Sequence, residues 1–86
     1  MAYAIQMCET QASGPPKVFA TPYEYILSRD EAIRVAKAHL DTAPLPNGHI
    51  VGADDPTKVF IRVVELDSNG SPTDRVVFEY KISDKG

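Results

Sequence analysis

The most informative segment is SRDEAIRVAKAHLDTA, residues 28–43, which predicts the only helix in this sequence. Ser28 and Glu31 have the spacing of a capping box, in which the two residues satisfy each other's free backbone N–H groups. Asp30 adds negative charge to the first turn, where the helix dipole favours it. Pro44 cannot continue the helix, so the predicted end is marked as well.

One side of this helix is apolar and narrow. At 100° per residue, one stripe collects the apolar side chains while the charged ones occupy the opposite side. A stripe so rich in alanine needs a sheet close beneath it. Its members are Ile33, Ala36, Leu40 and Ala43, with Ala32 beside them.

Strand-like segments lie on both sides of the helix. Residues 3–8 alternate in polarity, and 18–27, 58–66 and 75–82 are rich in β-branched and aromatic residues. Pro22 lacks the donor that a central strand needs, so the segment 18–27 is either an edge strand or broken there. Gly14, Pro15 and Pro16 place a loop between the first two strands.

The last two strands predict a hairpin with Asn69 and Gly70 at its tip. Counting back from this turn sets six apolar residues on the face that meets the helix. The predicted pairs are Val63 with Val76, Ile61 with Phe78, and Val59 with Tyr80. A slip of one residue would scatter this apolar set, which favours this register. Pro72 and the juxtaposition of Glu65 with Asp74 predict that the ladder opens before the tip and leaves a looser loop.

The predicted fold is α+β, with a single helix on one face of a three- to four-stranded antiparallel sheet in the order β-β-α-β-β. The 86 residues suffice for one small domain, 1–86. This order is similar to that of many small bacterial and phage domains of unassigned function, and the likeness is one of element order only.

Composition narrows the class of protein. The chain carries 43% hydrophobic and 24% charged residues, which is typical of a folded globule. No apolar run approaches the roughly 20 residues of a membrane span. Cys8 is the only cysteine, so no internal disulfide forms, and a cytoplasmic location is the simplest expectation.

No constellation of residues predicts catalysis, a metal site or a cofactor. His39 lies at the edge of the helix stripe without a second ligand at helical spacing, and His49 follows an Asn-Gly turn. Asp54 and Asp55 precede a proline, as in turns where Asp side chains accept from nearby N–H groups. Cys8 near a strand end favours a small buried residue over a nucleophile. We therefore expect no enzyme.

The residues most suggestive of function are tyrosines and a mixed sheet face. Tyr23 and Tyr25 share strand parity and are expected to project from one face, either as core or as interface. The sheet face away from the helix is apolar but interrupted by charge, which favours a partner or the connector 44–57 as its cover. The candidate residues on that face are Phe60, Arg62, Val64, Leu66 and Val77, interrupted also by Glu79.

These observations favour a non-catalytic protein-interaction domain, homodimeric through the outer sheet face or a strand edge. One alternative is a small regulator or inhibitor of a larger complex, of phage or mobile-element type. A second is a weak nucleic-acid binder that uses basic residues near the last two strands, although charges there balance and no basic block exists. A third is a hydrolase or metal protein built around His39, His49 and Asp54. The basic residues are Lys58, Arg62, Arg75 and Lys81.

Overall fold

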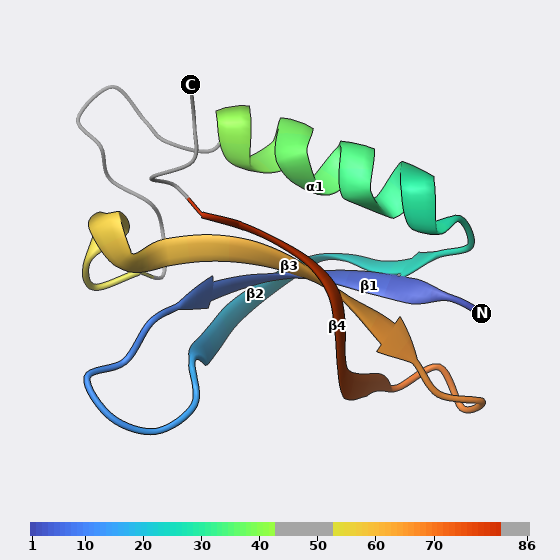
Figure 1. Ribbon diagram of the computed structural model, residues 1–86, viewed down its shortest axis with the longest axis horizontal. Coiled ribbons are helices and arrows are strands. Elements are labelled where there is room, and N and C mark those ends of the chain that lie inside the picture. Colours follow the sequence, from blue (N-terminus) through green and yellow to red (C-terminus); the bar gives the residue numbers. More distant parts are fainter. Residues whose placement is uncertain (43–52, 82–86) are drawn as a thin grey trace.

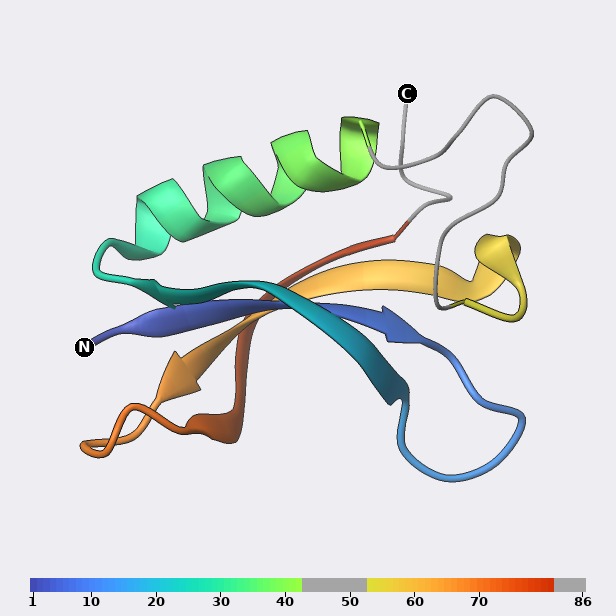
Figure 2. The same ribbon diagram turned by 180° about the vertical axis from the view of Figure 1, so that it is seen from behind.

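The computed structural model describes residues 1–42 and 53–81, which form one helix packed on a four-stranded antiparallel sheet (Figures 1 and 2). The predicted order β-β-α-β-β is confirmed. The elements are β1 (Tyr3–Glu9), β2 (Lys17–Ile26), α1 (Arg29–Thr42), a short 3₁₀ turn η1 (Pro56–Lys58), β3 (Val59–Leu66) and β4 (Pro72–Lys81).

The sheet order is β2-β1-β3-β4, so β1 and β3 are central and β2 and β4 are the two edges. Pro22 therefore lies in an edge strand, as one of the two sequence alternatives required. The β1–β2 ladder shifts its register three times between Tyr3 and Cys8, and one shift lies beside Pro22. These irregularities twist β2 and change which face its side chains occupy.

The helix begins and ends close to the predicted positions. The hydroxyl of Ser28 accepts a hydrogen bond from the Glu31 N–H at 3.3 Å, and the Ser28 carbonyl accepts from the Ala32 N–H at 2.9 Å. At the other end, the Thr42 hydroxyl donates to the carbonyls of Ala38 and His39. Ala43 and the connector that follows it, up to residue 52, lie outside the described residues.

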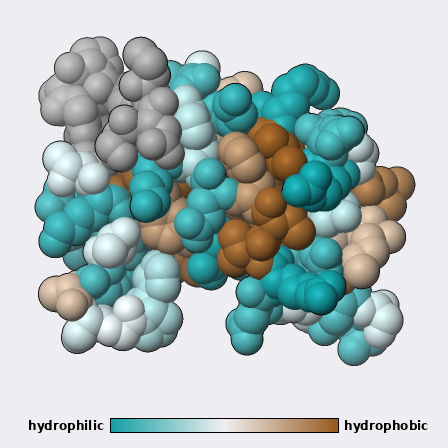
Figure 3. All heavy atoms as spheres, viewed as in Figure 1, coloured by the Kyte–Doolittle hydropathy of each residue, from teal (hydrophilic) through white to brown (hydrophobic). Residues whose placement is uncertain are grey.

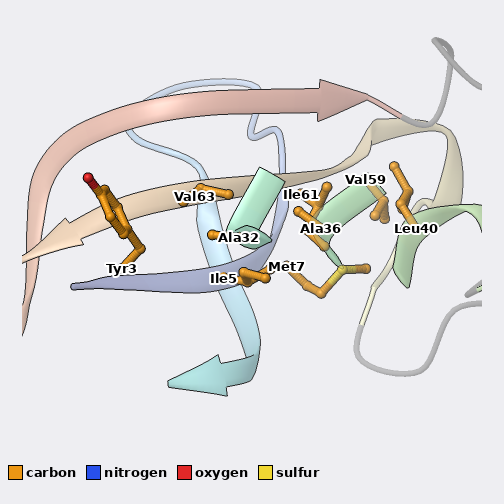
Figure 4. Packing of buried hydrophobic residues seen from close by; sticks show 9 residues of the cluster. All are labelled: Tyr3, Ile5, Met7, Ala32, Ala36, Leu40, Val59, Ile61 and Val63. Atoms are coloured by element: carbon orange, nitrogen blue, oxygen red, sulfur yellow. The ribbon is translucent and has the colours of Figure 1, made fainter. Parts of the chain in front are cut away.

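The main core lies between α1 and the central strands β1 and β3 (Figure 4). Ala32 and Ala36 let the helix approach the sheet closely, while Leu40 fills the space at its far end. Each large aliphatic side chain buried here contributes about 1.5–3 kcal/mol. The nine residues of this helix-side core are Tyr3, Ile5, Met7, Ala32, Ala36, Leu40, Val59, Ile61 and Val63.

The predicted register of the C-terminal hairpin is wrong by two residues. Ile61 lies opposite Tyr80, and Val63 lies opposite Phe78. The Asp67 N–H donates to the Ser71 carbonyl, and the resulting three-residue loop alone would move the pairing by one residue in the opposite direction. The ladder then shifts twice before Val63, by two residues and by one, which leaves the net difference of two.

The irregular ladder also exchanges two neighbouring valines. Val76 lies opposite Val64, on the face away from the helix, whereas Val77 packs against the helix-side core. The sequence predicted the reverse for both residues. Figures 1 and 2 show the physical consequence, a sharp bend that turns the first half of β4 away from the helix.

Candidate protein-interaction surface

The outer sheet face is closed by the domain's own residues. Phe60, Val64 and Leu66 are 5%, 1% and 6% exposed, so their side chains offer little area to a partner. Val64 and Leu66 form a second small core with Ala4, against which Ala2 packs. Three of the residues predicted for an interaction surface therefore lie on the expected face but are buried in it.

The polar centre of this face is also satisfied internally. Arg62 is half-buried and donates from Nε to Oε1 of Gln6 at 2.8 Å. Glu79 lies opposite Arg62 in the ladder. Cys8 is buried beside them, and burial raises the pKa of its thiol, while Arg62 lowers it and Glu79 raises it. A neutral thiol in this setting packs as a small apolar group.

Tyr23 and Tyr25 do not share a face, contrary to the prediction. Tyr23 lies opposite Ile5, and its ring meets that of His39 edge-on, with the centroids 5.9 Å apart. His39 is thus a boundary residue packed on an aromatic ring. Tyr25 lies beyond a register shift and is 62% exposed. The strict alternation assumed from the sequence fails because the edge ladder is irregular.

The exposed apolar side chains gather on one segment of the chain. Of the six large hydrophobic residues that are exposed among the described residues, four lie between residues 18 and 27. We call this the β2-edge surface, and it consists of Val18, Tyr23, Tyr25 and Leu27. Sequence reasoning overlooked Val18 and Leu27. Val18 could have been recognised as an apolar residue on a predicted edge strand. Leu27 could have been recognised as an apolar residue just before the helix and outside its apolar stripe.

The other edge of the sheet has a different character. Exposed positions of β4 include Asp74, Arg75 and Glu79, and charged side chains on an edge discourage pairing with other chains. In contrast, β2 carries only Lys17 and Glu24 as charged residues. Figure 3 shows one face of the molecule, on which apolar side chains gather near the middle between hydrophilic areas.

A pocket of about 400 Å³ opens at the end of the β2-edge surface. Leu27 is 70% exposed and lines this pocket together with Tyr25, so both side chains stand beside a hollow. Of the lining residues that the structure describes, Leu66 is the buried apolar one, and Asp67 has the only charged side chain. The lining residues are Met1, Ala2, Tyr25, Leu27, Leu66, Asp67, Ser68 and Gly70.

The polar side of the pocket is held rigid by the hairpin loop. Oδ1 of Asp67 accepts hydrogen bonds from the N–H groups of Asn69 and Ser71, both at 2.9 Å. Gly70 has a φ of +81°, a conformation that costs glycine little, and its N–H donates to the Asp67 carbonyl. Because both of these side-chain hydrogen bonds use Oδ1, they leave Oδ2 to accept from an additional donor.

A buried carboxylate holds the segment that leads into β3. Glu9 is 3% exposed and accepts from the N–H groups of Asp54 at 3.2 Å and Asp55 at 2.6 Å. Lys17 lies 3.7 Å from the same carboxylate. Oδ1 of Asp55 accepts from the N–H and hydroxyl of Thr57, which lowers the pKa of Asp55 and confirms the predicted turn. These contacts position the backbone of the segment that leads into β3.

The other candidates for metal or nucleic-acid binding are two histidines and four basic residues. Within residues 1–42 and 53–81, no group of three or more His, Cys, Asp or Glu residues could hold a metal ion. His49 lies outside the described residues. Arg62 binds Gln6, and Arg75 lies 3.5 Å from Glu65, so these two bases have acceptors within the domain. Nor does any helix of the described part combine the length and apolar character needed to cross a membrane.

Comparisons with protein-family models, with curated proteins and with solved structures find no match to this chain. Function is therefore inferred from the exposed side chains and their surroundings.

Proposed function

We propose that this protein is a non-catalytic protein-interaction domain that binds through the β2-edge surface. The observation that carries the proposal is the concentration of exposed large apolar residues on one edge strand and its exit. Exposed large apolar side chains, tyrosines among them, are typical of contact surfaces.

The structure favours the strand edge over the outer sheet face as the place of contact. Phe60 and Val64 are buried, so a partner would reach them only after the domain rearranged. In contrast, Tyr25 and Leu27 present most of their side-chain area without any rearrangement. The buried free thiol of Cys8 fits the cytoplasmic setting that forms part of this proposal.

Affinity retention tests the proposal. The full chain is immobilised as wild type, as the double variant Tyr25→Ser/Leu27→Ser, and as the control Val76→Ser, which removes an exposed apolar residue from the opposite edge. We expect one stoichiometric protein, another copy of the chain included, that the wild type and the control retain and the double variant loses. Retention that survives the double variant would refute the β2 edge as the contact surface.

A further inference from the structure

The pocket at the end of the β2-edge surface is bordered by side chains that project into solvent and also line the hollow. Leu27 and Tyr25 are mostly exposed, yet they line a hollow whose floor includes the buried Leu66. In a two-fold symmetric dimer the same patch serves both partners, so it must offer a projection and a recess at once. This patch has both.

Charge gives a second reason to choose the same chain as the occupant. Arg29 is exposed and stands only two residues after Leu27. It opens α1, where the helix dipole disfavours a cation, so its position brings the helix no benefit. Among the described residues that line the pocket, Asp67 has the only charged side chain, and its charge is opposite to that of Arg29. Leu27 and Arg29 are two residues apart, which corresponds to roughly 6–7 Å of backbone. This separation would let Leu27 of one copy enter the pocket while Arg29 of the same copy reaches Asp67 beside it.

We infer that the pocket receives Leu27 from a second copy of this chain, and that Arg29 of that copy pairs with Asp67. This inference rests on the proposed function, since it names the partner that the β2-edge surface binds. The two-fold axis repeats the arrangement, so each copy gives one leucine and receives one. The apolar contact supplies most of the affinity, while the two ion pairs lie at the rim and set the orientation.

Sedimentation velocity over a dilution series tests the inference on the full chain. The wild type is expected to dimerise, and Leu27→Ser is expected to weaken the dimer by about 100-fold or more, because both copies lose a buried leucine. Leu27 is exposed in the single chain, so this substitution should leave its thermal stability within about 0.5 kcal/mol. Val76→Ser is the matched control and should dimerise as the wild type does.

A mixing experiment tests the ion pair directly. Arg29→Glu places a second acid against Asp67, and Ser68→Lys places a base on the pocket rim opposite Arg29, without disturbing the Asp67 loop. Each variant alone should form a dimer at least about 10-fold weaker than the wild type. Mixed together, they should form heterodimers, because the introduced glutamate then faces the introduced lysine while the native pair remains on the other side. Asn69→Lys, beside the pocket, is the control for added charge.

Three results would overturn the inference. A wild type that stays monomeric at millimolar concentration excludes the second copy as occupant. Dimers unaffected by Leu27→Ser place the contact elsewhere. Variants that fail to associate on mixing remove the pairing of Arg29 with Asp67. If the chain is monomeric but still retains a different protein in a Leu27-dependent manner, this inference fails and the proposed function stands.

Discussion

Replacing Glu9 by alanine should strongly destabilise the domain. The substitution removes the acceptor for two backbone N–H groups, those of Asp54 and Asp55, at 3.2 and 2.6 Å. Hydrogen bonds to a charged group contribute about 1.5–3 kcal/mol each. Asp54 is exposed, so water can replace part of the loss there, and we expect a decrease of about 3 kcal/mol in the free energy of unfolding.

The contact with Lys17 adds little to this figure. Its ammonium group is substantially exposed and also lies 3.6 Å from Asp54, so it retains a partner when Glu9 is removed. Glu9→Gln should lose about half as much as Glu9→Ala, because the amide keeps one oxygen but turns an NH₂ group toward the second donor. A loss of about 3 kcal/mol is a large share of the 5–15 kcal/mol typical of a domain.

Urea unfolding at a shared slope measures the change, and Glu24→Ala serves as the control because it removes an exposed glutamate from the neighbouring strand. The control should change stability by no more than about 0.5 kcal/mol. Hydrogen exchange should show faster exchange at Asp54 and Asp55 in the Glu9 variants. A loss below about 1 kcal/mol in Glu9→Ala would refute the view that this carboxylate holds the segment before β3.

Three further predictions concern the two faces of the sheet. Burial raises the pKa of the Cys8 thiol in the folded state. The stability that the protonated thiol contributes is therefore complete below the unfolded-state pKa of about 8.5, and it is lost as pH rises through the higher folded-state pKa. Urea unfolding should therefore show a larger loss from about pH 8 to about pH 10 in the wild type than in Cys8→Ala; equal losses would contradict this. Arg62→Met should cost about 1–3 kcal/mol, because it leaves the buried Gln6 without its donor, and Arg62→Met/Gln6→Leu should recover much of that loss in the same assay. Ala36→Leu should cost about 1–3 kcal/mol by thermal unfolding because the side chain is fully buried between helix and sheet, whereas Ala38→Leu, on the exposed side of the helix, should be nearly neutral.

The sequence predicted the parts of the fold that repeat regularly. The helix could be placed because its cap, its apolar stripe and Pro44 are local signals that agree with one another. The alternation in residues 3–8 predicted a strand with Tyr3, Ile5 and Met7 on one face, and these three residues lie together in the helix-side core. These predictions needed no knowledge of distant contacts.

The predictions that failed all depended on an unbroken ladder. The register was counted from a two-residue turn at Asn69-Gly70, whereas Asp67 bonds to Ser71 across a three-residue loop. The shifts near Val77 then reversed the faces of two valines, and a shift in β2 separated Tyr23 from Tyr25. A bulge adds one residue without leaving a strong local signal, so it changes every face assignment beyond it.

The candidate surface was only half predictable for a similar reason. Residue type predicts Tyr23 and Tyr25 as contact candidates, but whether Phe60 and Val64 are covered depends on the bending of the whole sheet. Leu27 was passed over because it lies between a strand and a cap and fits neither pattern. The exposure of a side chain depends on the assembled fold. In this fold the exposed apolar residues lie at the β2 edge, whereas the sequence placed the candidate surface mainly on the outer sheet face.

The claim that two copies of this chain meet at the β2-edge surface is tested most directly by an NMR dilution series on the ¹⁵N-labelled chain, because NMR reports every backbone amide separately. We predict concentration-dependent shifts or broadening of amide signals confined to residues 18–29 and to residues 66–70 of the hairpin beside the pocket. The amide signals of β4 between Val76 and Lys81 should not change. Shifts centred instead on Phe60, Arg62 and Val64, or a spectrum that does not change with concentration in the wild type, would contradict it.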